Sequence, residues 1–165
     1  MKIYLMRHGI ASEPEGRNFE LDSQRPLSAE GRDIIAQIAR ALKKLDVNPD
    51  IILSSPYVRA KETATELAKE FNRQQHLVFS DLLIPDGKAE EIISAIVDNF
   101  MVEELLIVGH LPCLSLLSSL LAAGDLDLAI NIKKGGVCCL LADDLRLERR
   151  ATIEWHLTSK TLLKA

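Results

Sequence analysis

Short apolar runs alternate along this chain with longer segments of helical periodicity, and that alternation restricts the possible folds. The run from Leu105 to Val108 is apolar at every position, as in a parallel strand that is covered on both faces. Elsewhere apolar residues recur every three or four positions, as they do at Ile34, Ile35, Ile38 and Leu42. Strands that alternate with helices predict an α/β protein, with a mostly parallel central sheet and helices on both faces.

Six strands and four helices are expected, and they fit one domain that spans residues 1–165. The expected strands are Lys2–Met6, Ile51–Leu53, Leu77–Phe79, Leu105–Val108, Val137–Ala142 and Thr152–Leu157. A charged turn joins the last two, which are candidates for antiparallel pairing. Helices are expected after an N-cap at Ser28, after Ser55-Pro56 as N-cap and first helical residue, around Ile92–Val97, and after Pro112. Residues 12–26 are expected to be a loop, and residues 158–165 are left unassigned.

Composition limits the partners and the compartment. The 165 residues carry a formal net charge of −4 and the pI is about 5.6, so no overall positive field attracts nucleic acid. The apolar residues before Arg7 are too few for a signal peptide or a membrane span. The three cysteines lack the spacing of a disulfide framework, and the adjacent Cys138 and Cys139 would point to opposite faces of a strand. We therefore expect a cytoplasmic protein with reduced thiols and with neither nucleic acid nor a membrane as a partner.

Polar side chains follow three of the expected parallel strands. Arg7 and His8 come at the end of the first strand, and Arg59 lies in the first helical turn after the second. His110 follows the strand Leu105–Val108, with only Gly109 between them. In open α/β sheets, ligands bind beyond the carboxyl ends of the strands. If these strands are parallel neighbours, the two arginines and two histidines meet in one place.

Two arginines and two histidines around one point suit a phosphoryl group. A guanidinium offers planar, bidentate donors to phosphate oxygens. A neutral imidazole keeps a lone pair near neutral pH and can attack phosphorus, while a second histidine can donate to an oxygen as charge builds there. Because side chains supply the positive charge, such a site can transfer a phosphoryl group without a metal or another cofactor.

Other phosphatase chemistries fit the sequence less well. A cysteine phosphatase needs an arginine six positions after its cysteine, but those positions hold Ser119, Asp144 and Leu145. An aspartate nucleophile would close an apolar strand, whereas the Asp-x-Asp that begins at Asp125 follows Ala-Ala-Gly. The sequence has no Gly-x-x-x-x-Gly-Lys loop. Metal binding by the two histidines has weak support, because no cysteine or carboxylate stands at short ligand spacing from either.

Three motifs, in this order, resemble those of the histidine phosphatase superfamily, which has the phosphoglycerate-mutase-like fold. They are Arg7-His8-Gly9, the Ser-Pro-x-x-Arg-Ala-x-x-Thr pattern from Ser55 to Thr63, and VGHLP around His110. The segment RPLSAEGR, from Arg25 to Arg32, is similar to the family's sequence before its first helix. Chain length and motif order most resemble the small SixA-type phosphohistidine phosphatases, and the resemblance covers nearly the whole chain.

The resemblance implies a role for each matched residue. His8 is expected to be the nucleophile that becomes phosphorylated. Arg7, Arg59 and His110 are expected to hold the phosphoryl group. Arg25 is expected at the rim of the pocket as a substrate-binding residue.

The general acid of the larger family members has no clear match. Mutase-type members carry a glutamate between the second motif and the second histidine. The corresponding region reads LLIPDGKAEEI, where Asp86 is available as a candidate acid but no residue matches that glutamate. The SixA-like branch also lacks it, and its absence disfavours alkyl phosphate substrates.

The sequence thus predicts a metal-independent hydrolase that removes phosphate from a histidine of a signalling protein, such as a phosphotransfer domain, through a phosphorylated histidine of its own. Two alternatives stay open. One is a phosphomonoesterase or mutase of the same superfamily with a small phosphorylated substrate. The other is a non-catalytic module that binds phosphate or a phosphoprotein. The presence of both His8 and His110 favours the enzyme.

Overall fold

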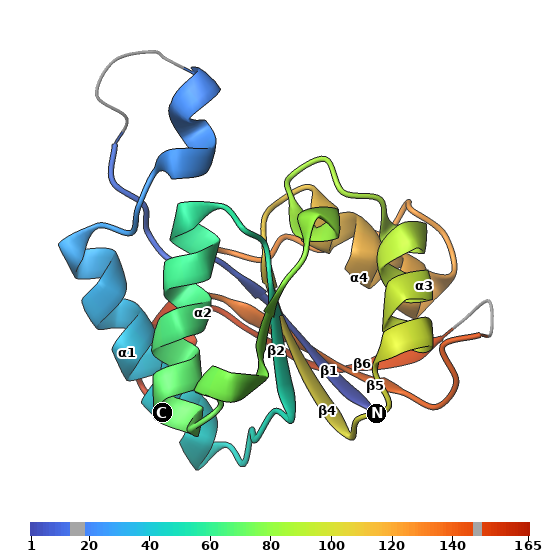
Figure 1. Cartoon of the computed structure of the whole chain (residues 1–165). Coiled ribbons are helices and arrows are strands. Elements are labelled where there is room, and N and C mark those ends of the chain that lie inside the picture. The colour runs from blue at the N-terminus through green and yellow to red at the C-terminus, as the bar shows by residue number, and fades with distance from the viewer. Residues whose placement is uncertain (14–18, 147–149) are drawn as a thin grey trace.

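The computed structural model describes residues 1–13, 19–146 and 150–165, and a six-stranded sheet lies at its centre (Figure 1). The strand order is β3-β2-β4-β1-β5-β6. The strands are β1 (Lys2–Arg7), β2 (Ile51–Ser54), β3 (Leu77–Phe79), β4 (Glu104–Gly109), β5 (Val137–Ala142) and β6 (Ala151–Leu157). Each strand lies where the sequence predicts one, with small differences at the ends.

Strands β3, β2, β4 and β1 run parallel. Their register places the carboxyl ends of β1, β2 and β4 at the same height in the sheet. Arg7 of β1 pairs with Gly109 of β4, and Ser54 of β2 pairs with Val108 of β4. Strand β5 is antiparallel to β1, and β6 is antiparallel to β5. The predicted α/β fold with a mostly parallel sheet and antiparallel late strands is therefore confirmed.

Helices cover both faces of the sheet (Figure 1). One face carries α1 (Ala29–Lys44), α2 (Val58–Phe71) and the short α5 (Ser159–Leu162), and the other carries α3 (Ala89–Asn99) and α4 (Cys113–Ala123). Ser28 caps α1 as predicted, because its hydroxyl accepts a hydrogen bond from the Gly31 N–H at 2.9 Å. None of the described helices combines the length and the apolar character that a membrane crossing requires.

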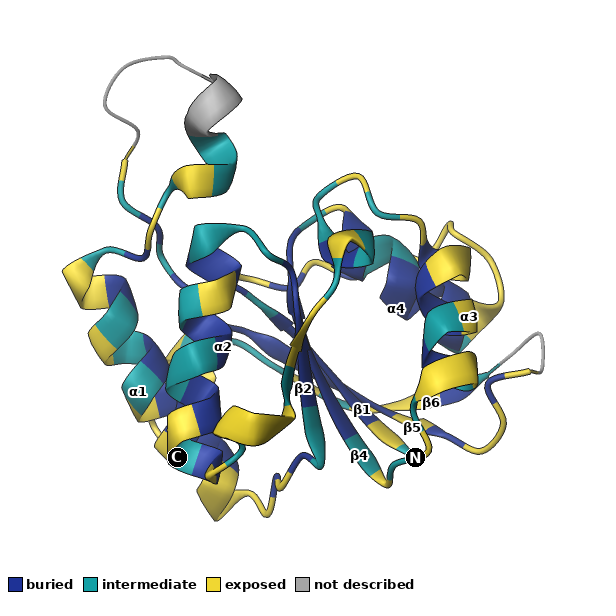
Figure 2. Ribbon diagram, in the orientation of Figure 1, coloured by how far each residue is buried: buried dark blue, intermediate teal, exposed yellow. Residues whose placement is uncertain are grey.

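The sheet separates two apolar layers, because successive side chains of a strand point to opposite faces. Ile3 packs in the layer under α3 and α4, whereas its neighbour Tyr4 packs in the layer under α1 and α2. Cys138 and Cys139 divide in the same way, and both thiols are buried and free. Figure 2 shows the resulting pattern, with a buried sheet at the centre and exposed positions on the outer faces of the helices.

The segment before α1 differs from the loop that the sequence predicts over residues 12–26. It contains a 3-10 helix, η1 (Phe19–Gln24), while residues 14–18 lie outside the described residues. A 3-10 helix of six residues is too short to show a helical apolar periodicity, so the pattern that identifies the longer helices does not identify it. Two more short 3-10 helices flank β3, namely η2 (Gln74–His76) and η3 (Asp81–Leu83).

The start of α2 is also later than predicted. The N-cap is Tyr57 rather than Ser55, and Val58 rather than Pro56 is the first helical residue. Ser55 still bonds to the neighbouring strand β4, because its N–H donates to the Val108 carbonyl at 3.0 Å. Its hydroxyl instead accepts from the Tyr57 N–H at 3.3 Å, which forms a tight turn between β2 and the helix.

Candidate active site

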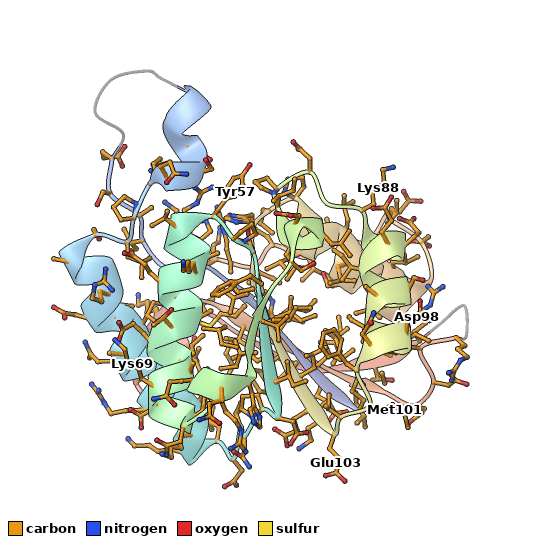
Figure 3. All side chains as sticks on the ribbon, in the orientation of Figure 1. Tyr57, Lys69, Lys88, Asp98, Met101 and Glu103 are labelled. Atoms are coloured by element: carbon orange, nitrogen blue, oxygen red, sulfur yellow. The ribbon has the colours of Figure 1, made fainter. Side chains whose placement is uncertain are left out.

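The level ends of β1, β2 and β4 bring the four predicted residues to one cavity of about 230 Å³. Tyr57, labelled in Figure 3, marks this edge of the molecule, and its ring lies 5.1 Å from that of His110. The His8 and His110 rings are 5.0 Å apart between centroids. The cavity is lined by Arg7, His8, Ala11, Arg25, Arg59, Pro85, His110, Leu111 and Lys134.

Two hydrogen bonds define the state of the His8 ring. Its Nδ1 lies 2.7 Å from the Gly9 carbonyl oxygen, which can only accept, so Nδ1 carries the proton. Arg59 donates its Nε–H to the other ring nitrogen, Nε2, at 3.2 Å. The bound proton therefore sits on Nδ1 and the lone pair is on Nε2, which faces the Arg59 guanidinium. This is the tautomer that a nucleophilic Nε2 requires.

The surroundings of His8 favour its neutral form. The residue is only 6 % exposed, and burial lowers the pKa of His8 to about 3. The Gly9 carbonyl opposes this change, whereas the positive charges of Arg59, Arg7 and Lys134 add to it. Nε2 is consequently unprotonated at physiological pH, and its lone pair accepts the hydrogen bond from Arg59.

His110 has the same burial but a different set of partners. Its Nε2 lies 2.9 Å from the Ser55 hydroxyl, while its Nδ1 is buried without a partner in the described part of the chain. The Ser55 hydroxyl can donate its proton to His110 Nε2, and in that tautomer the His110 proton is on Nδ1. Burial, and next the neighbouring His8, lower the pKa of His110 to about 3. The site thus holds a neutral histidine with an unused N–H.

The Arg7 side chain is half-buried and only partly satisfied. One Nη donates to the Ile132 carbonyl at 3.3 Å, whereas Nε is buried with no partner among the described residues. Burial and the nearby Arg59 lower the pKa of Arg7 below its usual value, although a guanidinium remains charged. The backbone beside it is fixed by Gly135, which has a φ of 71° and donates its N–H to the Arg7 and His8 carbonyls at 3.0 and 3.2 Å.

Thr63 connects the His8 loop to the helix that carries Arg59. Its hydroxyl accepts from the Gly9 N–H at 3.1 Å and donates to the Arg59 carbonyl at 2.7 Å. The first and second motifs are therefore held together by one buried side chain, which explains why a threonine closes the second motif. The sequence identified this residue only as a motif position.

Asp22 of η1 is a site residue that the sequence analysis missed. Its carboxylate pairs with Arg59 at 2.9 Å and with Arg25 at 3.1 Å, and its backbone carbonyl accepts from Arg59 Nη1 at 2.6 Å. Asp22 is not among the residues that line the cavity, but both arginines that it pairs with are. Lys134, which precedes β5, also lines the cavity, and no ion pair is found for it among the described residues. Neither residue stands at a strand end or in a motif, so no sequence signal pointed to them.

The two remaining predicted residues, Arg25 and Asp86, occupy different places. Arg25 does line the cavity, and its guanidinium is held by the Ser12 carbonyl at 3.0 and 2.9 Å. Asp86 is exposed and is not among the lining residues, although its neighbour Pro85 is. Within residues 1–13, 19–146 and 150–165, no three histidine, cysteine, aspartate or glutamate side chains gather as a metal site would require.

Comparisons with known proteins agree with this geometry. The profile of the Histidine phosphatase superfamily (branch 1) matches residues 3–83. Phosphohistidine phosphatase SixA of Escherichia coli is 30% identical over 128 residues, which is 76% of each chain. An uncharacterized protein of Picosynechococcus is 29% identical over 95% of this chain and 94% of its own. A solved structure of the protein histidine phosphatase SixA complexed with tungstate aligns with a TM-score of 0.84 at 25% identity, over 98% of this chain and 99% of that one.

Proposed function

We propose that this chain, a hydrolase that belongs to the histidine phosphatase superfamily, removes the phosphoryl group of a phosphohistidine by way of a covalent intermediate on His8. The observation that carries the proposal is the state of the His8 ring, whose Nδ1 donates to Gly9 and whose Nε2 keeps its lone pair beside two arginines. The name of the Escherichia coli relative and the tungstate in the solved relative support the same chemistry, since tungstate is a tetrahedral oxyanion like phosphate.

In the first step His8 Nε2 attacks phosphorus opposite the leaving ring. A new nitrogen–phosphorus bond forms as the substrate's nitrogen–phosphorus bond breaks, and the electron pair of that bond passes to the leaving imidazole. The Gly9 carbonyl stabilises the positive charge that develops on the His8 ring. Arg7 Nε and His110 Nδ1, which have no partner among the described residues, are the atoms that we expect to donate to the phosphoryl oxygens.

In the second step water attacks the phosphoryl group on His8. The nitrogen–phosphorus bond breaks and its electron pair returns to Nε2. The water oxygen and both of its protons leave as dihydrogen phosphate, which then releases one proton to solvent. The proton on Nδ1 stays in place throughout, so the ring returns to its starting tautomer. No protonated carboxyl group is needed in either step.

Cavity size supports a substrate that presents one phosphorylated ring from a larger surface. The volume of about 230 Å³ is below the roughly 300–1,000 Å³ usual for pockets that enclose a whole small ligand. It is adequate for a phosphoryl group with the ring attached to it. A phosphotransfer domain of a signalling protein offers its phosphohistidine in that way, and we propose such a domain as the protein partner.

A substrate panel tests the proposal. Specificity constants would be compared for a phosphohistidine-bearing phosphotransfer domain, nitrophenyl phosphate and a hexose phosphate in one buffer. We expect the phosphohistidine to be best and the hexose phosphate to be worst, because an alkoxide leaves poorly without a proton donor, which typically contributes about 10²–10⁴-fold. A hexose phosphate that proved the best substrate would refute the proposal.

A further inference from the structure

The carboxylate of Asp22 is unusual for its position beside an anion-binding cavity. One guanidinium joins it to the nucleophile, since Arg59 donates Nε–H to His8 Nε2 at 3.2 Å and Nη2–H to Asp22 Oδ2 at 2.9 Å. Arg25 donates to the other carboxylate oxygen at 3.1 Å. The Arg59 guanidinium thus lies between Asp22 and the reacting nitrogen of His8. Asp22 is on a segment that is separate in sequence from His8 and from Arg59.

A fixed negative charge here repels the phosphoryl group that the cavity is built to hold. Partial burial favours the neutral acid, but the hydrogen bond from Arg25 and the charge of Arg59 outweigh it and keep the pKa of Asp22 below its usual value. The carboxylate is therefore ionised at neutral pH and cannot act as a proton donor. Its position makes sense if the substrate carries a positive or N–H-bearing group next to its phosphoryl group.

Asp22 also keeps unused acceptor capacity. Each of its oxygens takes one hydrogen bond from an arginine, and each carboxylate oxygen can accept two. The side chain is 38% exposed, so the carboxylate is open to a group that enters from solvent. Within the described part of the chain, it is the carboxylate that pairs with cavity-lining arginines.

We propose that Asp22 accepts a hydrogen bond from the second ring nitrogen of the substrate's phosphohistidine and thereby holds that ring in its protonated form. This inference rests on the proposed function. Protonation of the second nitrogen makes the ring cationic, which weakens the nitrogen–phosphorus bond. When His8 attacks, the electron pair of that bond passes to the ring, which leaves as neutral imidazole and keeps the proton that faces Asp22. Asp22 then selects phosphohistidine over phosphate esters, whose leaving oxygen has no second N–H.

The pH dependence of kcat can test this role, because the charged and titratable groups around Asp22 are known. Arg25 and Arg59 face it directly, His110 lies close enough to be affected by its charge, and Arg7 and Lys134 line the same cavity. Both site histidines stay neutral near neutral pH, because burial lowers the pKa of each to about 3. Loss of kcat between neutral and mildly alkaline pH would therefore report the bound substrate ring.

The test compares Asp22→Asn with Asp86→Asn, which alters an exposed carboxylate for which no ion pair with Arg25 or Arg59 is found among the described residues. The probes are phosphoimidazole and nitrophenyl phosphate. We expect Asp22→Asn to lower kcat/KM for phosphoimidazole about 10- to 100-fold, which is the range of one charge-assisted hydrogen bond, and to leave or raise kcat/KM for nitrophenyl phosphate. The alkaline fall of kcat with phosphoimidazole should move to lower pH in Asp22→Asn and stay in place in Asp86→Asn.

Three results would count against the inference, and they are distinguishable. Equal losses on both probes, with an unmoved pH profile, would show that Asp22 only positions Arg59, and would overturn the inference alone. An Asp86→Asn variant with the same selective loss would also overturn it. Wild-type protein that hydrolyses nitrophenyl phosphate but not phosphoimidazole would refute the proposed function, and the role of Asp22 with it.

Discussion

The two ends of the sheet use charged residues in opposite ways. At the amino ends of β1 and β4, carboxylates tie the chain together: Asp50 accepts from the Glu103 and Glu104 N–H groups, both at 2.9 Å. Glu104 in turn accepts from the Tyr4 hydroxyl at 3.1 Å and from the Asn48 N–H at 2.9 Å. At the carboxyl ends, Arg7 and His110 each bury a polar atom that has no partner among the described residues.

Cavity size alone would identify the wrong end. A larger cavity, of about 460 Å³, lies at the amino ends of β1 and β4 and is lined largely by apolar side chains that include Phe100 and the fully exposed Met101. Figure 3 shows Met101 and Glu103 at that end and Tyr57 at the other. Buried polar groups that the fold does not satisfy cost stability, so their presence at one end is the stronger sign of a ligand site.

If the carboxyl end of the sheet is the active site, the largest loss of turnover is expected when His8 is replaced. His8→Ala should lower turnover at least about 10⁴-fold, as loss of a nucleophile does in other covalent enzymes, because it removes the nitrogen that we propose attacks phosphorus. Met101→Ala at the opposite end should retain wild-type turnover. Labelled substrate and an acid-free quench should give an acid-labile phosphoenzyme with wild type and with Met101→Ala, but not with His8→Ala. A labelled His8→Ala protein would assign the nucleophile elsewhere.

A smaller effect should separate the two arginines within the site. Arg59 is 6 % exposed and bonds to His8, whereas Arg25 is held by the Ser12 carbonyl at the edge of the cavity. We expect Arg59→Ala to lower kcat about 10²–10³-fold, since it removes a fixed charge that faces the transition state. Arg25→Ala should act mainly on KM. Equal losses of kcat in the two variants would contradict the rim position of Arg25.

How much of this site the sequence could predict depended on where each residue lies. Arg7, His8 and His110 follow strands whose apolar pattern is clear, and parallel strands bring their carboxyl ends together, so their convergence could be foreseen. Asp22 and Lys134 lie in polar connections without periodicity, and only tertiary contacts bring them to the cavity.

The same limit explains the two predictions that need correction. The start of α2 was placed too early, because the sequence cannot show that Ser55 is still bound to β4. The sequence predicts a loop where η1 lies, because six residues are too few to show a helical periodicity. In both cases a contact with a distant part of the chain decides the local structure.

The smallest expected effect is on stability, and it compares histidines at the two ends of the sheet. The buried His8 has a pKa of about 3, below its usual 6.5, so between these values the unfolded chain binds a proton that the folded protein does not. The free energy of unfolding should therefore fall as pH falls through this window, by up to about 1.4 kcal/mol per pH unit for each such histidine. Above pH 6.5 this contribution to the slope vanishes.

Urea unfolding at pH 7, 6 and 5 measures this slope. His8→Asn keeps a polar side chain of similar reach but cannot titrate, so it should be less sensitive to acid than wild type. His76→Asn changes an exposed imidazole whose Nδ1 lies 3.0 Å from the Asp50 carbonyl at the amino end, and it is the control for the replacement of a histidine by asparagine. If His8→Asn kept the wild-type slope, the neutral His8 on which the attack depends would be wrong. If the slope is reduced in His8→Asn but not in His76→Asn, the buried neutral His8 at the carboxyl end is the cause of the loss of stability in acid.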